Sequence, residues 1–283
     1  MNFAGIPDEF ARCKNARIVI IPIPFDLGST WMKGAENGPE AMFAAAENME
    51  LFDLETNTSV YRQGIFVDSP VLADNPDILV KNVEERVNMW LLRGKFVVCF
   101  GGNHSISIGA AKAHAKAYEK LSVLQLDAHA DLRNSYEGST NNHACVGARI
   151  QEFADLVQVG IRSCSASEML KIKKTAYIPA SEIFLNPDWE QKALDALGKQ
   201  VYISLDMDVL DPSEFPSTGT PEPGGLQYWQ LYHFLKKLDS KKEIVGFDMS
   251  ELLPSPVSQV SDFLAAKLLY QLFSLIFNHD EKK

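Results

Sequence analysis

Cysteine is scarce in this chain and widely spaced. The 283 residues include four cysteines, Cys13, Cys99, Cys145 and Cys164, and no two of them form a C-x-x-C pair. Scattered cysteines in a long chain argue against a disulfide framework. We therefore expect free thiols and a reducing, cytoplasmic location.

Long uninterrupted hydrophobic runs are also missing. The opening stretch MNFAGIPDEFARCKN carries Asp8 and Glu9 early and has no apolar signal core. The longest apolar stretch, residues 263–277, is interrupted by Lys267 and Gln271 and is short for a membrane span. We expect no membrane partner, and we interpret this stretch as a helix that packs on the body of the protein or on a neighbouring subunit.

Positive charge is in deficit. The chain has 27 Lys and Arg against 37 Asp and Glu, a formal net charge of −10. This balance argues against a nucleic-acid partner, because such partners are held by basic contacts to phosphates. It weakly favours a small cationic substrate, although solubility alone would account for the same charge.

What the chain does have is an alternation of short apolar strands and helical stretches. Strands rich in β-branched residues are predicted at 16–25, 95–100, 122–127, 156–161, 201–209 and 243–252. Helices are predicted at 38–52, 76–94, 105–121, 189–198 and 228–238. The alternation indicates a single α/β domain over residues 1–283, with a mostly parallel sheet covered by helices on both faces.

Polar clusters follow three of these strands. They contribute His104 in GGNHS, Asp127, His129 and Asp131 in DAHADLR, and Asp206 and Asp208 in DMDVLDP. Taken alone, each cluster could be a solvated loop or a turn. Because ligands of open parallel sheets bind at the carboxyl ends of the strands, we expect the three clusters to meet at one edge.

The combined set predicts a metal site. Six nitrogen and oxygen ligands rich in carboxylate suit manganese, or another oxygen-preferring divalent ion, better than zinc. Two divalent ions would balance four carboxylates and lower the pKa of a shared water, so that hydroxide exists near neutral pH. Such a centre suits a cationic substrate.

At this point the motifs resemble a known family. GGNHS, DAHADLR, SLDMDVLDP, GTPEPGG and GFDMSE, in this order, resemble the ureohydrolases, the arginase and agmatinase family, over nearly the whole chain. The resemblance implies an arginase-like three-layer α/β/α fold with an eight-stranded parallel sheet, two Mn²⁺ per chain, and a homo-oligomer, trimeric or hexameric. By motif match, one ion would be held by His104, Asp127, Asp131 and Asp206, and the other by Asp127, His129, Asp206 and Asp208.

The resemblance also implies catalytic residues. Glu251, in GFDMSELLP, matches the carboxylate that grips the guanidinium, and a carboxylate can take that planar cation in a paired contact. His143 matches a histidine that shuttles protons, and Asp131 would relay a proton to the leaving amine. The plainer alternatives are a surface histidine and a solvated glutamate.

The segment of residues 131–150, GIRS at 160–163 and GTPEPGG at 219–225 resemble the agmatinase branch. The predicted reaction is therefore agmatine to putrescine and urea, a step of polyamine biosynthesis. Aminopropylagmatine, guanidinobutyrate and arginine are alternative substrates. Asn103 stands where the family usually has Asp, and Asn142 where Ser is expected. We expect the first to alter metal affinity through His104, and the second to alter the far end of the substrate site.

Two other functions fit the same residues less well. A zinc deacetylase on this fold would hold one ion with fewer ligands, and the second Asp-x-Asp pair and Glu251 argue against it. A non-catalytic, metal-binding member of the family is supported only by Asn103 and Asn142, whereas all six ligands are intact.

Overall fold

The computed structural model describes residues 2–172 and 176–278, and the strands in this part of the chain form one sheet of eight in the order β2-β1-β3-β8-β7-β4-β5-β6. They are β1 (Ile18–Ile23), β2 (Ile65–Val67), β3 (Phe96–Gly101), β4 (Ser122–Leu126), β5 (Asp155–Ile161), β6 (Ala176–Pro179), β7 (Gln200–Asp206) and β8 (Glu243–Ser250). Every described pairing is parallel. The predicted eight-stranded parallel sheet is confirmed.

The strands are apolar on both faces because both faces are covered. In β1, Ile18 and Ile20 belong to one hydrophobic core, and Val19, Ile21 and Ile23 belong to the other. Successive side chains of a strand point to opposite faces, so a strand buried on both sides needs a continuous apolar run.

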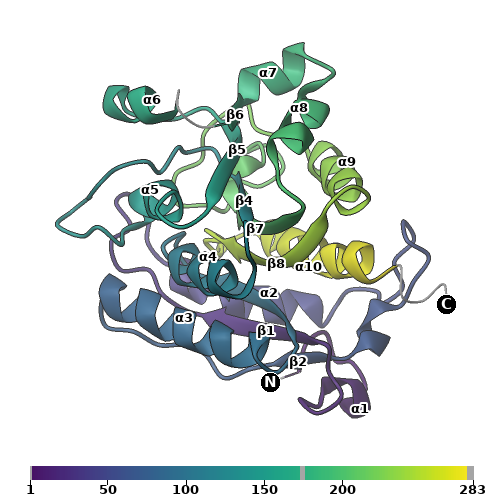
Figure 1. Cartoon of the computed structure of the whole chain (residues 1–283). Coiled ribbons are helices and arrows are strands. Elements are labelled where there is room, and N and C mark those ends of the chain that lie inside the picture. The colour runs from purple at the N-terminus through teal and green to yellow at the C-terminus, as the bar shows by residue number, and fades with distance from the viewer. Residues whose placement is uncertain (1, 173–175, 279–283) are drawn as a thin grey trace.

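Helices form the two outer layers, one on each side of the strands (Figure 1). One core takes side chains from α3 (Pro76–Leu91), α4 (Ile106–Ala117), α5 (Val146–Ile150) and α6 (Ala166–Ile172). The other takes them from α2 (Gly38–Ala46), α7 (Ala180–Leu185), α8 (Trp189–Ala196), α9 (Tyr228–Asp239) and α10 (Val260–Phe277). The short α1 (Asp8–Ala11) precedes β1. The predicted α/β/α layering is confirmed.

Helix α10 is long and apolar enough to cross a membrane by length and composition alone, but 72% of that stretch is buried inside the protein. It packs against α2 and α9, so the predicted packing on the body of the protein is confirmed.

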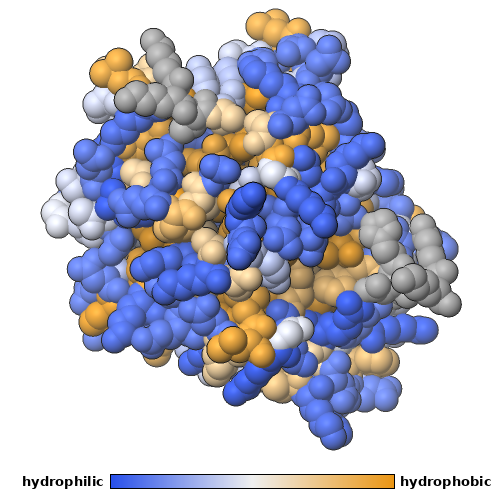
Figure 2. All heavy atoms as spheres, viewed as in Figure 1, coloured by the Kyte–Doolittle hydropathy of each residue, from blue (hydrophilic) through white to orange (hydrophobic). Residues whose placement is uncertain are grey.

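Viewed from the same side as in Figure 1, hydrophilic side chains cover most of the visible outer surface (Figure 2).

Two strands of the sheet were not predicted from the sequence, and one helix ends earlier than predicted. Strands β2 and β6 have three and four residues and lie at the two edges of the sheet, too short to show a hydrophobic period. The helix predicted through residue 52 ends at Ala46. The chain after it turns back toward α10, where Tyr270 Oη donates to Leu51 O at 2.5 Å.

The strand order creates the crevice in which a ligand is expected. After β3 the chain crosses to β4 and leaves room for two strands, which β7 and β8 later fill. As a result β3, β8, β7 and β4 are neighbours, and the polar motifs all follow the carboxyl ends of these four strands. Open α/β sheets bind their ligands at such a switch in strand order, outside the carboxyl ends of the strands.

Candidate active site

Each of the four central strands delivers a predicted site residue. His104 follows β3, Glu251 follows β8, Asp127 follows β4, and Asp206 is the last residue of β7. The predicted convergence of the polar clusters at one edge of the sheet is therefore present.

The turn after β3 requires its glycines. A Cβ on Gly102 would lie 2.0 Å from Phe25 O, a contact that only glycine avoids. The Gly102 carbonyl accepts a hydrogen bond from Glu251 N at 2.7 Å. The motif GGNHS thus ties the His104 loop to the end of β8.

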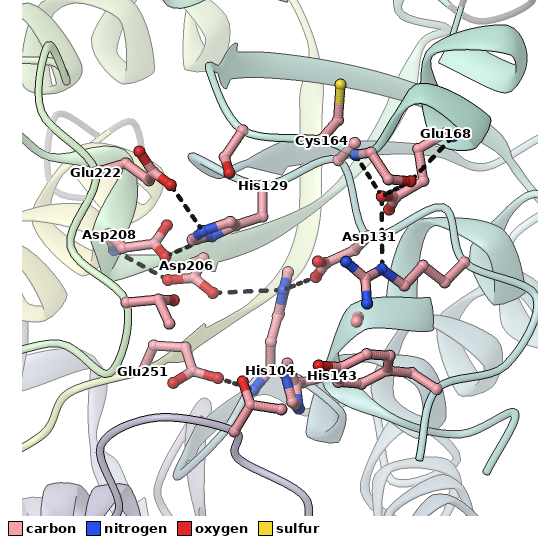
Figure 3. A pocket seen from close by; sticks show the side chains of 18 residues that line it. His104, His129, Asp131, His143, Cys164, Glu168, Asp206, Asp208, Glu222 and Glu251 are labelled. Atoms are coloured by element: carbon pink, nitrogen blue, oxygen red, sulfur yellow. Dashed lines mark hydrogen bonds and ion pairs between the residues drawn. The ribbon is translucent and has the colours of Figure 1, made fainter. Parts of the chain in front are cut away.

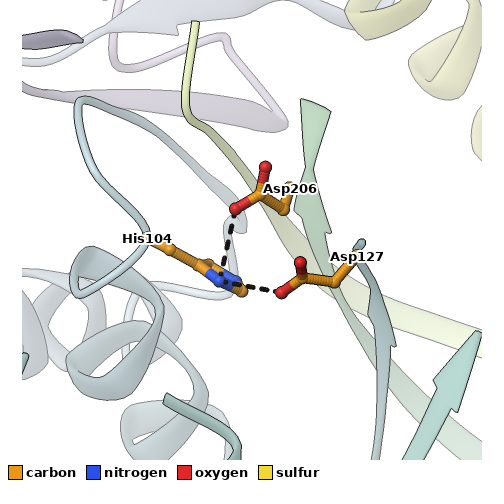
Figure 4. A group of neighbouring side chains, drawn as sticks. All are labelled: His104, Asp127 and Asp206. Atoms are coloured by element: carbon orange, nitrogen blue, oxygen red, sulfur yellow. Dashed lines mark ion pairs between the residues drawn. The ribbon is translucent and has the colours of Figure 1, made fainter. Parts of the chain in front are cut away.

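The first group of candidate ligands gathers around His104 (Figure 4). Its Nδ1 is 3.0 Å from Asp131 Oδ2, 3.2 Å from Asp127 Oδ2 and 3.4 Å from Asp206 Oδ2. All four side chains are buried. Three carboxylates therefore point at one imidazole nitrogen, which is the arrangement predicted for the first ion.

The second group gathers around His129. Its Nδ1 is 2.9 Å from Asp208 Oδ2 and 3.7 Å from Asp127 Oδ1. Asp127 thus turns one oxygen toward each histidine, the position expected of a bridging ligand. His104, Asp127 and Asp206 form one candidate metal group, and Asp127, His129 and Asp208 form another. Asp206, predicted to bridge as well, belongs to the first group only.

Bound cations would stabilise the buried carboxylates of this cluster. Burial and the charge of Asp127 raise the pKa of Asp131 to about 7. Burial and the charges of Asp208 and Asp127 raise the pKa of Asp206 well above its usual range. Buried like charges at this spacing destabilise one another unless positive charge lies between them. Four carboxylates and two imidazoles are a donor set that fits two divalent ions.

Two predicted catalytic residues adopt a backbone conformation that is rare outside glycine. Asp131 has φ +51° and Glu251 has φ +64°. Non-glycine residues in this left-handed region are strained and concentrate at functional sites. The strain here aims both carboxyl groups into the same pocket.

Glu251 and His143 face this pocket as predicted. Glu251 Oε1 accepts a hydrogen bond from His104 N at 2.7 Å. Burial raises the pKa of Glu251 to about 8, and the negative charge of the nearby Asp208 adds to this rise. Burial, with the charges of His104 and His129, lowers the pKa of His143 to about 4. Among the described residues, His143 Nδ1 is buried without a hydrogen-bond partner. The His143 ring packs edge-on against Tyr136, with centroids 5.9 Å apart.

The pocket has a volume of 390 Å³ and opens past a ring of polar side chains (Figure 3). Five of the six predicted metal ligands line it, with Glu251 and His143 beside them. Asp127 is fully buried beneath its floor. The lining also includes Arg133, Tyr136, Cys164, Glu168, Thr220 and Glu222.

A row of buried polar side chains supports the ligands from below, and the sequence analysis missed it. Gln158, Gln125, Ser204 and Asp248 are register partners across β5, β4, β7 and β8. Each is flanked on both sides by apolar residues of its strand, which is the signal that could have revealed the row. A fully buried polar group must be hydrogen-bonded, so it marks a local network.

Two contacts link this row to the ligands. Gln125 Nε2 donates to Asp127 Oδ2 at 2.7 Å. Ser204 Oγ lies 2.9 Å from His104 Nε2 and donates to Asp248 Oδ1 at 3.3 Å. The row therefore fixes the orientation of a carboxylate and an imidazole that both face the pocket floor.

Arg162, in GIRS, was also missed as a site residue. Its guanidinium donates six hydrogen bonds to the backbone carbonyls of Asp208, Glu222, Gly160, Val209 and Leu210. It therefore ties the short 3-10 helix after β7, which carries Asp208, to the GTPEPGG loop, which carries Glu222.

The structure shows which contacts Asn103 and Asn142 make, while their effects on metal affinity and on the far end of the substrate site stay predictions. Asn103 Nδ2 donates to Leu27 O at 3.2 Å, and its Oδ1 accepts from Ser105, so its described contacts do not include the His104 ring. An amide suits this position because aspartate could not donate to Leu27 O. Asn142 Oδ1 accepts from Ala144 N at 3.0 Å and caps the short helix of His143; it does not line the pocket.

Comparisons with known proteins agree with this geometry. The sequence matches the Arginase family over residues 16–274. It is similar to an N(1)-aminopropylagmatine ureohydrolase of Thermus thermophilus, with 39% identity over 93% of this chain and 91% of that protein. An agmatinase of Pyrococcus horikoshii is 32% identical over 93% of each chain. The solved agmatine ureohydrolase of Thermoplasma volcanium has a TM-score of 0.91 and 29% identity, covering 100% of this chain and 97% of that one.

Proposed function

This chain belongs to the arginase family, and we propose that it is a metal-dependent ureohydrolase that releases urea from a linear guanidino amine. Agmatine, giving putrescine, and aminopropylagmatine are the two favoured substrates. One observation carries the proposal: two groups of metal-ligating side chains and the Glu251 carboxylate meet in the same pocket. The similarity to both an aminopropylagmatine ureohydrolase and an agmatinase supports the substrate class.

The ligand set supports a centre of two manganese ions. His104, Asp127, Asp131 and Asp206 would hold one ion, and Asp127, His129, Asp206 and Asp208 the other. When bound, such a pair lowers the pKa of a shared water and so supplies a nucleophile at neutral pH.

The surroundings of His104 Nε2 support the assignment of His104 as a metal ligand. Because Ser204 Oγ donates to Asp248, it is left to accept from His104 Nε2–H. The Nδ1 lone pair of the same ring then faces the cluster, which is the form of histidine that binds a metal.

The protein's own residues position the substrate and move protons. Burial raises the pKa of Glu251 to about 8, but the positive charges of a bound guanidinium and of ions held by the cluster would favour its ionised form. Glu251 then binds the guanidinium by charge-assisted hydrogen bonds and holds its carbon above the cluster. Asp131, 3.0 Å from His104, takes a proton from the nucleophile and passes it to the departing nitrogen. His143 is neutral at pH 7, since its pKa is about 4, and its unpartnered Nδ1 can accept or deliver a proton at the pocket wall.

A substrate panel tests the proposal. The protein is loaded with Mn²⁺, and urea release is measured from agmatine, aminopropylagmatine, 4-guanidinobutyrate and arginine. We expect urea from agmatine or aminopropylagmatine at rates well above those from the two substrates that carry a carboxylate. Urea from none of the four would refute the function, and a preference for arginine would refute the substrate class.

A further inference from the structure

We propose that Glu222 binds the ammonium group at the far end of the substrate, and that Arg162 holds the loop that presents it. The inference rests on the proposed function and adds to it the residue that selects a second positive charge. The observations are the distribution of carboxylates in the pocket and the way the GTPEPGG loop is anchored.

Two carboxylates line the pocket outside the metal cluster and Glu251: Glu168 and Glu222. Glu168 is already engaged. Its Oε1 accepts a hydrogen bond from Leu132 N at 3.0 Å, and its Oε2 accepts one from Ser165 N at 2.8 Å and lies 3.6 Å from Arg133 Nε. Its charge is balanced by the protein itself, so it has little capacity for a substrate cation.

Glu222 is the carboxylate of the lining that is still available. Its side chain is 37% exposed, and the nearest basic nitrogen among the described residues is His129 Nε2 at 4.0 Å. Within this part of the chain, its carboxylate accepts no hydrogen bond. A carboxylate that faces a pocket with one distant ion-pair partner, His129 at 4.0 Å, and no hydrogen bond is suited to a cation from outside the protein.

Glu222 and Glu251 line the same pocket, so a substrate held at Glu251 can extend toward Glu222. The His129 ring turns Nδ1 toward Asp208 at 2.9 Å and Nε2 toward Glu222. Glu222 therefore lies one imidazole ring farther out than the ligand cluster, on the same side of the pocket (Figure 3). We infer that the alkyl chain of the substrate runs from the ligand cluster toward the more exposed Glu222.

The loop that carries Glu222 is held at two points. Arg162 donates to Glu222 O from Nη2 at 2.8 Å and from Nε at 3.1 Å, and to Asp208 O at 2.6 Å. Asp211 accepts from the backbone of Gly224 and Gly225 at 2.8 and 3.0 Å. The backbone at Glu222 is thus fixed relative to Asp208, so the loop itself loses little ordering entropy when a ligand binds.

The experiment compares ligands that differ only in the far charge. On the Mn²⁺-loaded enzyme, kcat/KM is measured for agmatine and for n-butylguanidine, and calorimetry gives the affinity for the diamine putrescine and for n-butylamine. The variants are Glu222→Gln and the matched control Glu119→Gln. Glu119 is exposed and precedes β4, at the amino end of that strand, whereas the site lies at the carboxyl ends.

We expect Glu222→Gln to reduce kcat/KM for agmatine about tenfold, mainly through KM, because one charge-assisted hydrogen bond at a half-exposed position is lost. n-Butylguanidine should change less than about twofold, and the preference for putrescine over n-butylamine should shrink by the same tenfold factor. The charge reversal Glu222→Lys should shift the preference toward 4-guanidinobutyrate. Glu119→Gln should leave all these values unchanged.

Equal losses for agmatine and n-butylguanidine, or a diamine preference that survives Glu222→Gln, would overturn the role of Glu222. These outcomes are distinct from a failure of the proposed function, in which the wild type releases no urea. In that case the calorimetry still decides, since diamine binding that is weak in the wild type or independent of Glu222 rejects the inference.

Discussion

Replacing Arg162 by lysine tests whether one side chain organises two parts of the site. The guanidinium donates six hydrogen bonds to five backbone carbonyls. Lysine keeps the positive charge but has only three donors on a single nitrogen. The substitution therefore changes geometry and hydrogen bonding rather than charge.

The expected cost follows from the number of lost bonds. At least three of the six bonds disappear, and a typical hydrogen bond contributes about 1 kcal/mol to stability. The partly exposed surroundings let water replace some of them, so we expect the free energy of unfolding to fall by about 3 kcal/mol. Because Asp208 O and Glu222 O lose their common anchor, the affinity for the second metal ion and the KM for agmatine should both worsen.

Denaturant unfolding gives the stability, and titration with Mn²⁺ followed by metal analysis gives the affinity. Arg12→Lys is the matched control, since Arg12 is exposed and lies at the end of α1. A variant Arg162→Lys that unfolds within about 0.5 kcal/mol of the wild type and keeps its metal affinity would refute the reasoning.

Three further predictions concern single side chains. Glu251→Gln should lower kcat/KM for agmatine about a hundredfold, because a charge-assisted pair to the guanidinium is lost, while the manganese content stays the same. Ser204→Ala removes the contact 2.9 Å from His104 Nε2 and should weaken manganese binding about tenfold to a hundredfold by metal titration; unchanged affinity would argue against the supporting row. Burial lowers the pKa of His114 to about 4, so between about pH 6.5 and 4 the unfolded chain binds a proton at this residue that the folded protein does not. The free energy of unfolding should therefore decrease as the pH is lowered through that window. Denaturant unfolding at pH 7 and pH 4 measures the decrease, and His114→Phe should make it smaller by about 3 kcal/mol.

The fold was largely predictable because the central strands are long, apolar and regularly spaced. The edge strands β2 and β6 were not, because a strand of three or four residues has no readable period. The early end of α2 at Ala46 depends on contacts with α10, which is more than 200 residues away in sequence. Tertiary contacts of this kind override local helix propensity. The predicted cytoplasmic location and homo-oligomer stay predictions.

The innermost part of the site was predictable for a chemical reason. Aspartate and histidine crowded at the ends of buried strands are costly unless they bind something, so the motifs themselves indicate ligands. The supporting residues were harder to find, because Ser204 and Gln125 differ from their apolar neighbours by a single polar group. Arg162 and Glu222 could be paired only in three dimensions, since 60 residues separate them.

The central claim is that six side chains form a two-ion centre that hydrolyses a guanidino compound. The most direct test measures bound manganese and urea release in the same samples, as metal-free protein is titrated from zero to four equivalents of Mn²⁺ per chain. We predict that urea release from agmatine or aminopropylagmatine rises with bound manganese and saturates at two ions per chain. Saturation at one ion, or urea release that does not depend on manganese, would contradict the claim.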